Sequence, residues 1–441
     1  AEKRFGYNTD MKKKKATVSK LALRGGTPVL KKPYPPVYTV GQREIAAAMN
    51  VLRKGPLSDF LGVAGEYFLG GKHVLSLEHA FTKKFKVKHA VSFNSATTAL
   101  HGAVVALGIG PGDEVILPPY TMSASAMAVL MNGAVPVFSD IDGKTFCIDA
   151  ESVRTRITKH TKAIMAVNLF GQAADFGPLL ALAKEHNLKI IEDNAQAPAA
   201  KWQGRYTGTI GDIGVFSFNF HKTMQSGEGG ILVTNSDAYA LRAQLCRNHG
   251  ESVVDGMPAY DGGPIFGSNY RMTELTAAIA EVQLSRLDFL NAKNQALVRY
   301  LSEQLSAIPG LTLPYVAPRN EHVYFAYVIT VDEKKLGLTR DRLVEAMRAE
   351  GFPMSRGYQK PLHLYKLFQE QRAFNNTHFP FKSEGYDGAP DYSKGICPVA
   401  ERLYEKEVTM TQICQHPRTK KHIDLFVRAL KKVLTHKNEL Q

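Results

Sequence analysis

The chain has 441 residues, of which 44% are hydrophobic and 22% are charged, and this balance is ordinary for a globular protein of two or three domains. The sequence has no run of about 18 apolar residues, so we expect no membrane span. No apolar stretch follows the basic N-terminus as it would in a signal peptide. We therefore expect a cytoplasmic protein without a membrane contact.

Cysteine and charge patterns argue against two further classes of protein. The net charge is +14, and much of it lies in the run Lys12–Lys15 and after Pro417. These runs lack interleaved aromatic residues, so they favour a solvated arm and helix surface over a nucleic-acid site, although an anionic small substrate would use the same charge. No CxxC spacing occurs, so we expect no metal and no disulfide framework from the four cysteines, Cys147, Cys246, Cys397 and Cys414.

The predicted elements begin after a basic flexible arm with an extended lead-in, residues 1–35. From residue 36 to 291 we expect a large domain. Strands alternate with short helices there, and this order is typical of a mostly parallel sheet covered on both faces. The expected strands are 89–94, 113–118, 135–141, 162–170, 188–194, 214–218 and 229–234, with helices at 97–107, 123–133 and 176–187.

A long helical stretch, 271–308, follows the last of these strands. The composition then changes, with an expected strand at 321–331 and a helix at 340–351. We interpret residues 292–441 as a smaller C-terminal α+β domain. The expected fold class is therefore α/β with a second, smaller domain.

The ends of three predicted strands carry residues suited to chemistry. Ligands of such sheets bind beyond the carboxyl ends of the strands. Asp193 stands where one strand stops, the small residues Ser95, Ala96 and Thr97 join another strand to a helix, and Lys222 follows a third. Pyridoxal phosphate needs a cradle for its phosphate, a carboxylate for its ring nitrogen and a lysine for its aldehyde. The combination therefore predicts this cofactor.

Four ordered motifs then resemble the DegT/DnrJ/EryC1/StrS aminotransferases, which act on keto-sugars and related cyclitols. They are "GPGDEVILPPYT", "IEDNAQA", "GDIGVFSFNFHK" with "GEGG", and "GSNYRMTELTAAIA". The resemblance runs from "LALRGGTPV" to the C-terminal helix. It implies the aspartate-aminotransferase-like fold, fold type I, of pyridoxal-phosphate enzymes.

The resemblance also implies roles for the residues that touch the cofactor ring. Lys222 would form the internal aldimine, Asp193 would pair with the pyridinium nitrogen, and Gln196 would bond the ring hydroxyl. The family often has Trp or Phe after the Thr of the "YT" loop, where it stacks on the ring. That position is Met122 here, so we expect Met122 under the ring and regard Tyr120 as the weaker candidate.

Further residues would hold the phosphate and the substrate. Ala96 and Thr97 would bind the phosphate with help from Ser217, although the family usually has Gly where this chain has Ala96. Asn269 would reach the phosphate of the neighbouring subunit, which implies a homodimer with shared active sites. The "GYQKPLHLYKLF" segment would place two residues near the acceptor, Tyr358 and His363, although a buried histidine bonded to backbone is an equal alternative for the second.

Several functions remain open from the sequence. Dehydratases of this family replace the lysine with histidine, and this chain has both His221 and Lys222. Counting five positions from Ser217 gives Lys222, which favours transamination. Glutamate or glutamine is the expected donor, and a nucleotide-linked keto-deoxysugar is the expected acceptor. A free keto-cyclitol (inosose) stays open because the segment before Asn269 is long, and a non-catalytic regulator is the remote alternative.

Overall fold

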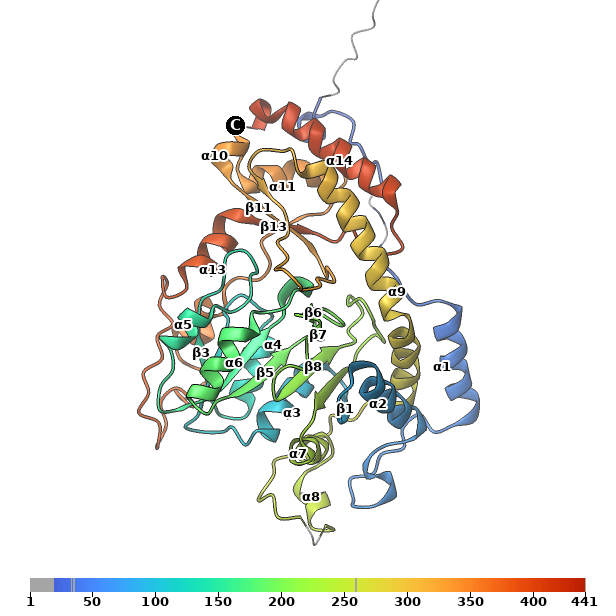
Figure 1. Cartoon of the computed structure of the whole chain (residues 1–441), viewed down its shortest axis with the longest axis vertical. Coiled ribbons are helices and arrows are strands. Elements are labelled where there is room, and N and C mark those ends of the chain that lie inside the picture. The colour runs from blue at the N-terminus through green and yellow to red at the C-terminus, as the bar shows by residue number, and fades with distance from the viewer. Residues whose placement is uncertain (1–19, 33, 35, 258–259, 441) are drawn as a thin grey trace, which may run out of the picture.

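The computed structural model describes residues 20–32, 34, 36–257 and 260–440 (Figure 1). Its central sheet has seven strands in the order β1-β9-β8-β5-β4-β2-β3. The pairs from β3 to β8 are parallel, and β9 pairs antiparallel with both β8 and β1. The predicted α/β class with a mostly parallel sheet is confirmed. The strands are β1 (His89–Phe93), β2 (Glu114–Leu117), β3 (Val135–Phe138), β4 (Thr161–Val167), β5 (Lys189–Asp193), β8 (Ile213–Ser217) and β9 (Gly230–Thr234).

Alternate residues of the buried strands face different helices, as the two-residue period of a strand requires. Phe216 in β8 packs against Phe81 and Phe85 of one helix, with ring centroids 5.4 and 4.7 Å apart. Its neighbour Val215 belongs instead to the cluster that contains Leu100. Fully apolar strands therefore lie between two helical layers. The helices are α1 (Gln42–Lys54), α2 (Lys72–Phe85), α3 (Ala96–Ala106), α4 (Ala124–Met131), α5 (Ala150–Arg154), α6 (Phe176–Glu185), α7 (Asp237–Arg247) and α8 (Glu251–Val254).

A smaller antiparallel sheet has four strands in the order β10-β11-β13-β12 and its own apolar core. Helix α9 (Glu274–Leu305) runs from the large sheet to this second layer (Figure 1). The predicted domain boundary after residue 291 falls inside this continuous helix and stays a prediction. The elements are β10 (Leu311–Thr312), β11 (Tyr327–Val331), β12 (Ser355–Arg356), β13 (Val408–Thr411), α10 (Glu333–Leu336), α11 (Arg340–Ala349) and α14 (Lys420–Thr435), and a separate hairpin pairs β6 (Lys201–Trp202) with β7 (Arg205–Tyr206).

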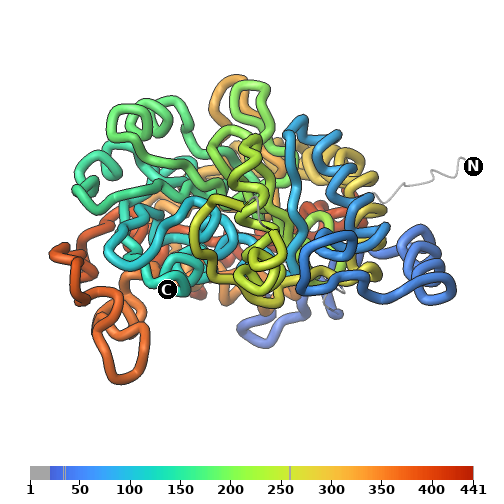
Figure 2. The backbone as a smooth tube through the Cα atoms, turned by 90° about the horizontal axis from the view of Figure 1, so that it is seen from below, coloured from blue at the N-terminus to red at the C-terminus, as the bar shows by residue number. Residues whose placement is uncertain are grey.

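The segment between α12 (Lys366–Gln369) and α13 (Pro398–Arg402) returns to the large sheet. Figure 2 shows part of it as a loop that projects from the body of the molecule. Its base covers β3, an edge strand: the ring of Phe138 lies 5.8 Å from that of Tyr392, and Tyr392 Oη donates a 2.7 Å hydrogen bond to the Pro136 carbonyl of β3. The segment therefore protects an edge that would otherwise expose unpaired backbone.

None of the helices in the described part of the chain is long and apolar enough to cross a membrane. Residues 1–19 of the predicted basic arm lie outside the described residues. Residues 20–32, which follow them, pack against the smaller domain, and Leu21 is fully buried there.

One buried carboxylate holds this N-terminal strap, residues 20–41, to the smaller domain. Glu350 accepts 2.9 Å hydrogen bonds from the backbone N–H groups of Ala22 and Val29. Lys432 of α14 lies 2.8 Å from the same carboxylate. Farther along the strap, Thr39 bonds to Gln283 of α9 at 3.1 Å. The strap therefore runs from the smaller domain to the part of α9 that lies beside the large domain.

Replacing Glu350 with Ala leaves Lys432 buried without its partner and two N–H groups of the strap unpaired. We expect Glu350→Ala to lower the apparent free energy of unfolding by about 3 kcal/mol, measured by denaturant titration. Glu345→Ala is the control, because Glu345 pairs with Arg342 in a half-exposed contact and such pairs contribute about 0–1 kcal/mol. Equal losses in the two variants would contradict a structural role for Glu350.

Candidate active site

The predicted site residues come from strands that are neighbours in the sheet. Asp193 ends β5, Ser217 ends the adjacent strand β8, and Lys222 follows in the loop after β8. Gly230 pairs with Ser217 at the start of β9, and Phe93 at the end of β1 pairs with the same glycine. The sheet order therefore brings the three strand ends to one edge, as expected for an α/β sheet.

Asp193 is a buried carboxylate with few partners. It is 5% exposed and accepts hydrogen bonds from Ser125 Oγ at 2.8 Å and from the Ala195 N–H at 3.2 Å. Burial raises its pKa, and the two hydrogen bonds and the charge of Lys222 oppose that shift. A buried anion of this kind is stabilised by a cation placed beside it. The protonated ring nitrogen of pyridoxal phosphate fits this requirement.

Lys222 is a half-buried amine beside an aromatic ring. Its Nζ lies 4.9 Å from the centroid of the Phe325 ring. This amine donates no hydrogen bond to any residue that the structure describes. Burial lowers the pKa of Lys222 to about 8, against the opposing effect of the Asp193 charge. A larger fraction of the side chain is therefore the neutral, nucleophilic amine than in an ordinary lysine.

His221, the neighbour that the sequence left as an alternative, also lies beside the Phe325 ring. Its ring packs edge-on against Phe220 and Phe325, with centroids 5.2 and 5.9 Å away. Burial and the charge of Lys222 lower the pKa of His221 to about 4. This imidazole is therefore neutral at neutral pH.

The turn between β1 and α3 has the geometry of a phosphate cradle. Ser95 caps the helix by accepting from the Thr98 N–H at 3.2 Å. The Ala96 and Thr97 N–H groups are in the first turn, where a helix has no internal acceptors for them. A Cβ on Gly230 would lie 2.5 Å from Ala96 N, so only glycine allows β9 to approach here. Ser217, 5% exposed, lies in the adjacent strand and accepts from the Asn219 N–H at 3.3 Å. These residues fit the phosphate group.

Gln196 and Tyr358 join the two domains at the site. Gln196 accepts a 2.9 Å hydrogen bond from the Phe170 N–H, and its amide donates to Tyr358 Oη at 2.9 Å. The Tyr358 N–H donates to Tyr120 Oη, also at 2.9 Å. Burial and the nearby charge of Asp193 raise the pKa of Tyr358 to about 12. Tyr358 is therefore a neutral phenol that the smaller domain presents to the large one.

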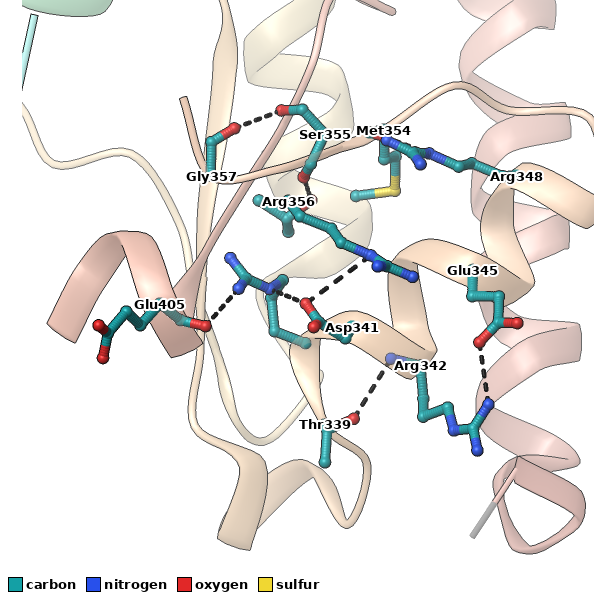
Figure 3. A network of polar contacts seen from close by, with 12 residues as sticks. Thr339, Asp341, Arg342, Glu345, Arg348, Met354, Ser355, Arg356, Gly357 and Glu405 are labelled. Carbon is teal, nitrogen blue, oxygen red and sulfur yellow. Dashed lines mark hydrogen bonds and ion pairs between the residues drawn. The ribbon is translucent and has the colours of Figure 1, made fainter. Parts of the chain in front are cut away.

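A polar network around Gly357, which precedes Tyr358 in the chain, holds the backbone of this loop (Figure 3). The buried guanidinium of Arg340 donates to the carbonyls of Tyr404, Glu405 and Val408 at 3.1, 2.6 and 2.6 Å. The carbonyl of Val408 also accepts from the Gly357 N–H at 2.7 Å. Gly357 has φ +76°, and a Cβ there would approach Tyr404 to 3.1 Å. Arg340 thus acts on Tyr358 through the backbone.

Three predicted site residues lie apart from the contacts described above. Met122 is 49% exposed, and Asn269 is exposed with its Oδ1 accepting from Arg271 Nε at 2.9 Å. His363 is fully buried, and its Nε2 lies 2.9 Å from Glu401 Oε1. None of the contacts that the structure gives His363 involves Lys222, so a role near the acceptor stays a prediction. Tyr120 is fully buried behind Tyr358.

Sequence reasoning missed Ser125, Phe325 and Arg340. Ser125 lies four residues after Thr121 in a small-residue helix and gives no signal of its contact with Asp193. Phe325 lies within a strand-like apolar run, and Arg340 in an ordinary amphipathic helix pattern. Their roles follow only from contacts across the fold.

A cavity of about 580 Å³ opens beside the site. It lies between the strap, the loop of Lys222, helix α9 and the smaller domain. Lys222 is the only one of the predicted cofactor residues that lines it.

The lowered pKa of Lys222 gives a test that does not depend on turnover. In protein stripped of any cofactor, we expect acylation of Lys222, followed by peptide mass spectrometry, to have its midpoint near pH 8. Asp193→Asn should move the midpoint to lower pH, because the Asp193 charge raises the Lys222 pKa. A midpoint near 10.4, the value of an ordinary lysine, or an upward shift in the variant would contradict this electrostatic description.

Comparison with known proteins is consistent with this geometry. The chain is 42% identical to GDP-perosamine synthase of Caulobacter vibrioides over 295 residues, 67% of this chain and 78% of that protein. It is 34% identical to L-glutamine:2-deoxy-scyllo-inosose aminotransferase of Streptoalloteichus tenebrarius over 96% of this chain and 99% of that protein. The crystal structure of an aminotransferase from Psychrobacter cryohalolentis matches with TM-score 0.79 and 30% identity, covering 92% of this chain and 99% of that one.

The model of the DegT/DnrJ/EryC1/StrS aminotransferase family matches residues 61–388. That range contains the cradle, Asp193, Lys222 and Tyr358. The predicted resemblance, the fold type and the pyridoxal phosphate cofactor are thereby confirmed. The chain belongs to the DegT/DnrJ/EryC1/StrS family and is a pyridoxal-phosphate-dependent aminotransferase.

Proposed function

We propose that the protein transfers the amino group of glutamate or glutamine to the ketone of a nucleotide-linked keto-deoxysugar. The observation that carries the reaction is the buried Asp193 beside Lys222, whose pKa is lowered to about 8. The relative named GDP-perosamine synthase, 42% identical, supports a nucleotide-linked acceptor. We also propose a cytoplasmic location, which the four free, buried cysteines support.

Bound pyridoxal phosphate supplies an aldehyde that exchanges amines and a ring that accepts electrons. In our proposal Lys222 is the residue that binds it covalently and, once released, moves the proton of the substrate carbon. Asp193 keeps the ring nitrogen protonated, and Ser125 orients that carboxylate. The first-turn N–H groups of Ala96 and Thr97, with Ser217, bind the phosphate.

Other side chains in this proposal orient the ring and close the site. Gln196 bonds the ring hydroxyl while its amide stays on Tyr358, so closure of the smaller domain and alignment of the ring depend on each other. Met122 packs on the exposed face of the ring. We also propose that Tyr358 and His363 lie near the acceptor. Tyr358 would contact the acceptor directly, and His363 would act through the residues around it.

A free keto-cyclitol is the second candidate acceptor. The 2-deoxy-scyllo-inosose aminotransferase relative aligns over 96% of this chain, whereas GDP-perosamine synthase aligns over 67% of it. A panel of nucleotide-linked keto-sugars and free inososes, each with glutamate and with glutamine, separates the candidates by the amino product. Loss of a substrate hydroxyl instead of gain of an amine would indicate a dehydratase.

We further propose a homodimer that shares its active sites. Five apolar side chains between residues 57 and 69 are 37–54% exposed: Leu57, Leu61, Val63, Tyr67 and Leu69. Arg271 connects this run to Asn269, because it donates to the Phe60 carbonyl at 3.3 Å and to Asn269 Oδ1 at 2.9 Å. A second copy that covers the run would receive Asn269 at its edge, near the phosphate of the partner's cofactor.

Asp193→Asn tests the electron sink directly. The amide is nearly the same shape but cannot hold the ring nitrogen protonated by charge. We expect the first half-reaction with glutamate, followed by stopped-flow absorbance, to slow at least about a hundredfold, or about 3 kcal/mol. Asp175→Asn is the control, since that exposed carboxylate caps α6 and Asn caps equally well. An unchanged rate in Asp193→Asn would refute the role.

Leu61→Asp tests the dimer. A charge in a covered apolar patch carries a large desolvation cost, so we expect light scattering to show a shift from dimer to monomer. Phe374→Asp makes the same change at a 50% exposed residue of the projecting segment and should leave the mass unchanged. A wild-type monomer, or a dimer that survives Leu61→Asp, would count against this interface.

A further inference from the structure

The side chain of Gln196 has one orientation that satisfies both of its hydrogen bonds. Its Oε1 accepts a 2.9 Å hydrogen bond from the Phe170 N–H. A backbone N–H can only donate, so the oxygen of the amide faces Phe170 and the nitrogen faces Tyr358. The contact from Gln196 Nε2 to Tyr358 Oη is also 2.9 Å long. Because an amide NH₂ group only donates, the hydroxyl of Tyr358 is the acceptor in this bond.

The turn that supplies the Phe170 N–H is held by its surroundings. Phe170 has φ +59° and ψ 6°, in the left-handed region that a bulky residue rarely adopts. The carbonyl of the next residue, Gly171, accepts a 2.9 Å hydrogen bond from the Val323 N–H. Backbone strain of this kind persists where the surrounding structure maintains it, and it is frequent at functional sites. The fold therefore sets the direction of the N–H that orients Gln196.

The phenol proton of Tyr358 has no acceptor among the residues that the structure describes. The hydroxyl oxygen accepts from Gln196, and it is the backbone N–H of Tyr358 that bonds to Tyr120 Oη. The rings of Phe170 and Tyr120 pack edge-on against the ring of Tyr358, with centroids 5.4 and 6.1 Å away. The pKa of Tyr358, raised to about 12, keeps the proton in place at neutral pH. Tyr358 is thus a fixed O–H donor whose acceptor is missing.

The groups around this hydroxyl favour a neutral oxygen as the acceptor. Its contacts with Gln196, Phe170 and Tyr120 are all with uncharged groups. The carboxylate whose charge acts on Tyr358, that of Asp193, is negative and opposes a second anion nearby. A substrate carboxylate is bound best by a cation such as arginine, whereas the carbonyl oxygen of a ketone needs only one neutral donor.

We propose that Tyr358 donates a hydrogen bond to the ketone oxygen of the acceptor, and that the Phe170 N–H keeps the phenol proton free for this bond by orienting Gln196. The proton stays on Tyr358, so the bond orients and polarises the ketone without a proton transfer. This inference rests on the proposed function and deepens it, because it gives the atom of the acceptor and the direction of the hydrogen bond.

A cycle of changes in protein and ligand isolates this bond. The probes are the ketone of the panel that yields the most amino product and its analogue with CH₂ in place of C=O. Both are titrated calorimetrically into the holoenzyme without an amino donor, so that no amine is transferred. We expect Tyr358→Phe to weaken binding of the ketone about two- to tenfold, the size of one neutral hydrogen bond. Its affinity for the analogue should stay at the wild-type value.

Tyr365→Phe is the matched control. It removes a hydroxyl from the same segment of the chain, and that hydroxyl makes no hydrogen bond to any residue that the structure describes. We expect wild-type affinity for both ligands in this variant. Equal weakening of ketone and analogue by Tyr358→Phe, or no weakening of either, overturns the proposed contact.

The polarity of the hydroxyl can be measured in protein free of cofactor and ligand. Vibrational bands of tyrosine differ between a phenol that accepts and one that donates, and subtracting the spectrum of Tyr358→Phe isolates those of Tyr358. We expect an accepting phenol in the wild type. Gln196→Glu supplies the reference for a donating phenol at about pH 9, where an ordinary carboxyl is ionised and can only accept. A donating phenol in the wild type overturns the proposal, because its proton would already be in use.

Failure of this inference is distinguishable from failure of the proposed function. Amino transfer to a ketone of the panel, together with a Tyr358→Phe variant that binds ketone and analogue equally less well, overturns the contact alone. If no ketone of the panel gains an amine, the proposed reaction is overturned. The vibrational spectrum then still decides whether Tyr358 has a free proton, because that measurement needs neither cofactor nor substrate.

Discussion

The site depends on keeping a carboxylate and an amine out of water without letting them neutralise each other. Burial raises the pKa of Asp193 and lowers that of Lys222, while each partially opposes the shift of the other. A directly paired, fully solvated couple would have neither property. Asp193 ends β5 and Lys222 lies in the loop that follows the adjacent strand β8. Ser125 donates to the carboxylate of Asp193, and the amine of Lys222 lies over the ring of Phe325.

Three different connections join the large and the smaller domain. Helix α9 is continuous between them, the strap is anchored by Glu350, and Tyr358 bonds to Gln196. The third lies near Asp193, whose charge acts on Tyr358. Arg340 supports this connection by holding the backbone of the Tyr358 loop.

The exposed residues of the site are available to a second copy of the chain, whereas the buried ones are not. Met122 and Asn269 are among the exposed residues, and the apolar run from Leu57 to Leu69 is continuous with Asn269 through Arg271. A site with one open side and an apolar rim is suited to completion by a second copy.

The alternating strands, the long helix and the polar residues near the strand ends were predictable from the sequence. Strand and helix periods differ, and Asp193, Lys222 and the Ala96–Thr97 turn together supply the three groups that pyridoxal phosphate needs. Asp193, Lys222 and the Ala96–Thr97 turn were therefore identifiable from local pattern.

The residues that support them became identifiable only from the folded chain. Ser125, Phe325, Arg340 and Glu350 lie in ordinary helix and strand patterns, and their partners are far away in the chain. The contact of the buried His363 with Glu401, 38 residues farther along the chain, likewise has no signal in the motif, and its predicted place near the acceptor stays a prediction. Long-range contacts of this kind depend on how whole elements pack, and no local spacing encodes that arrangement.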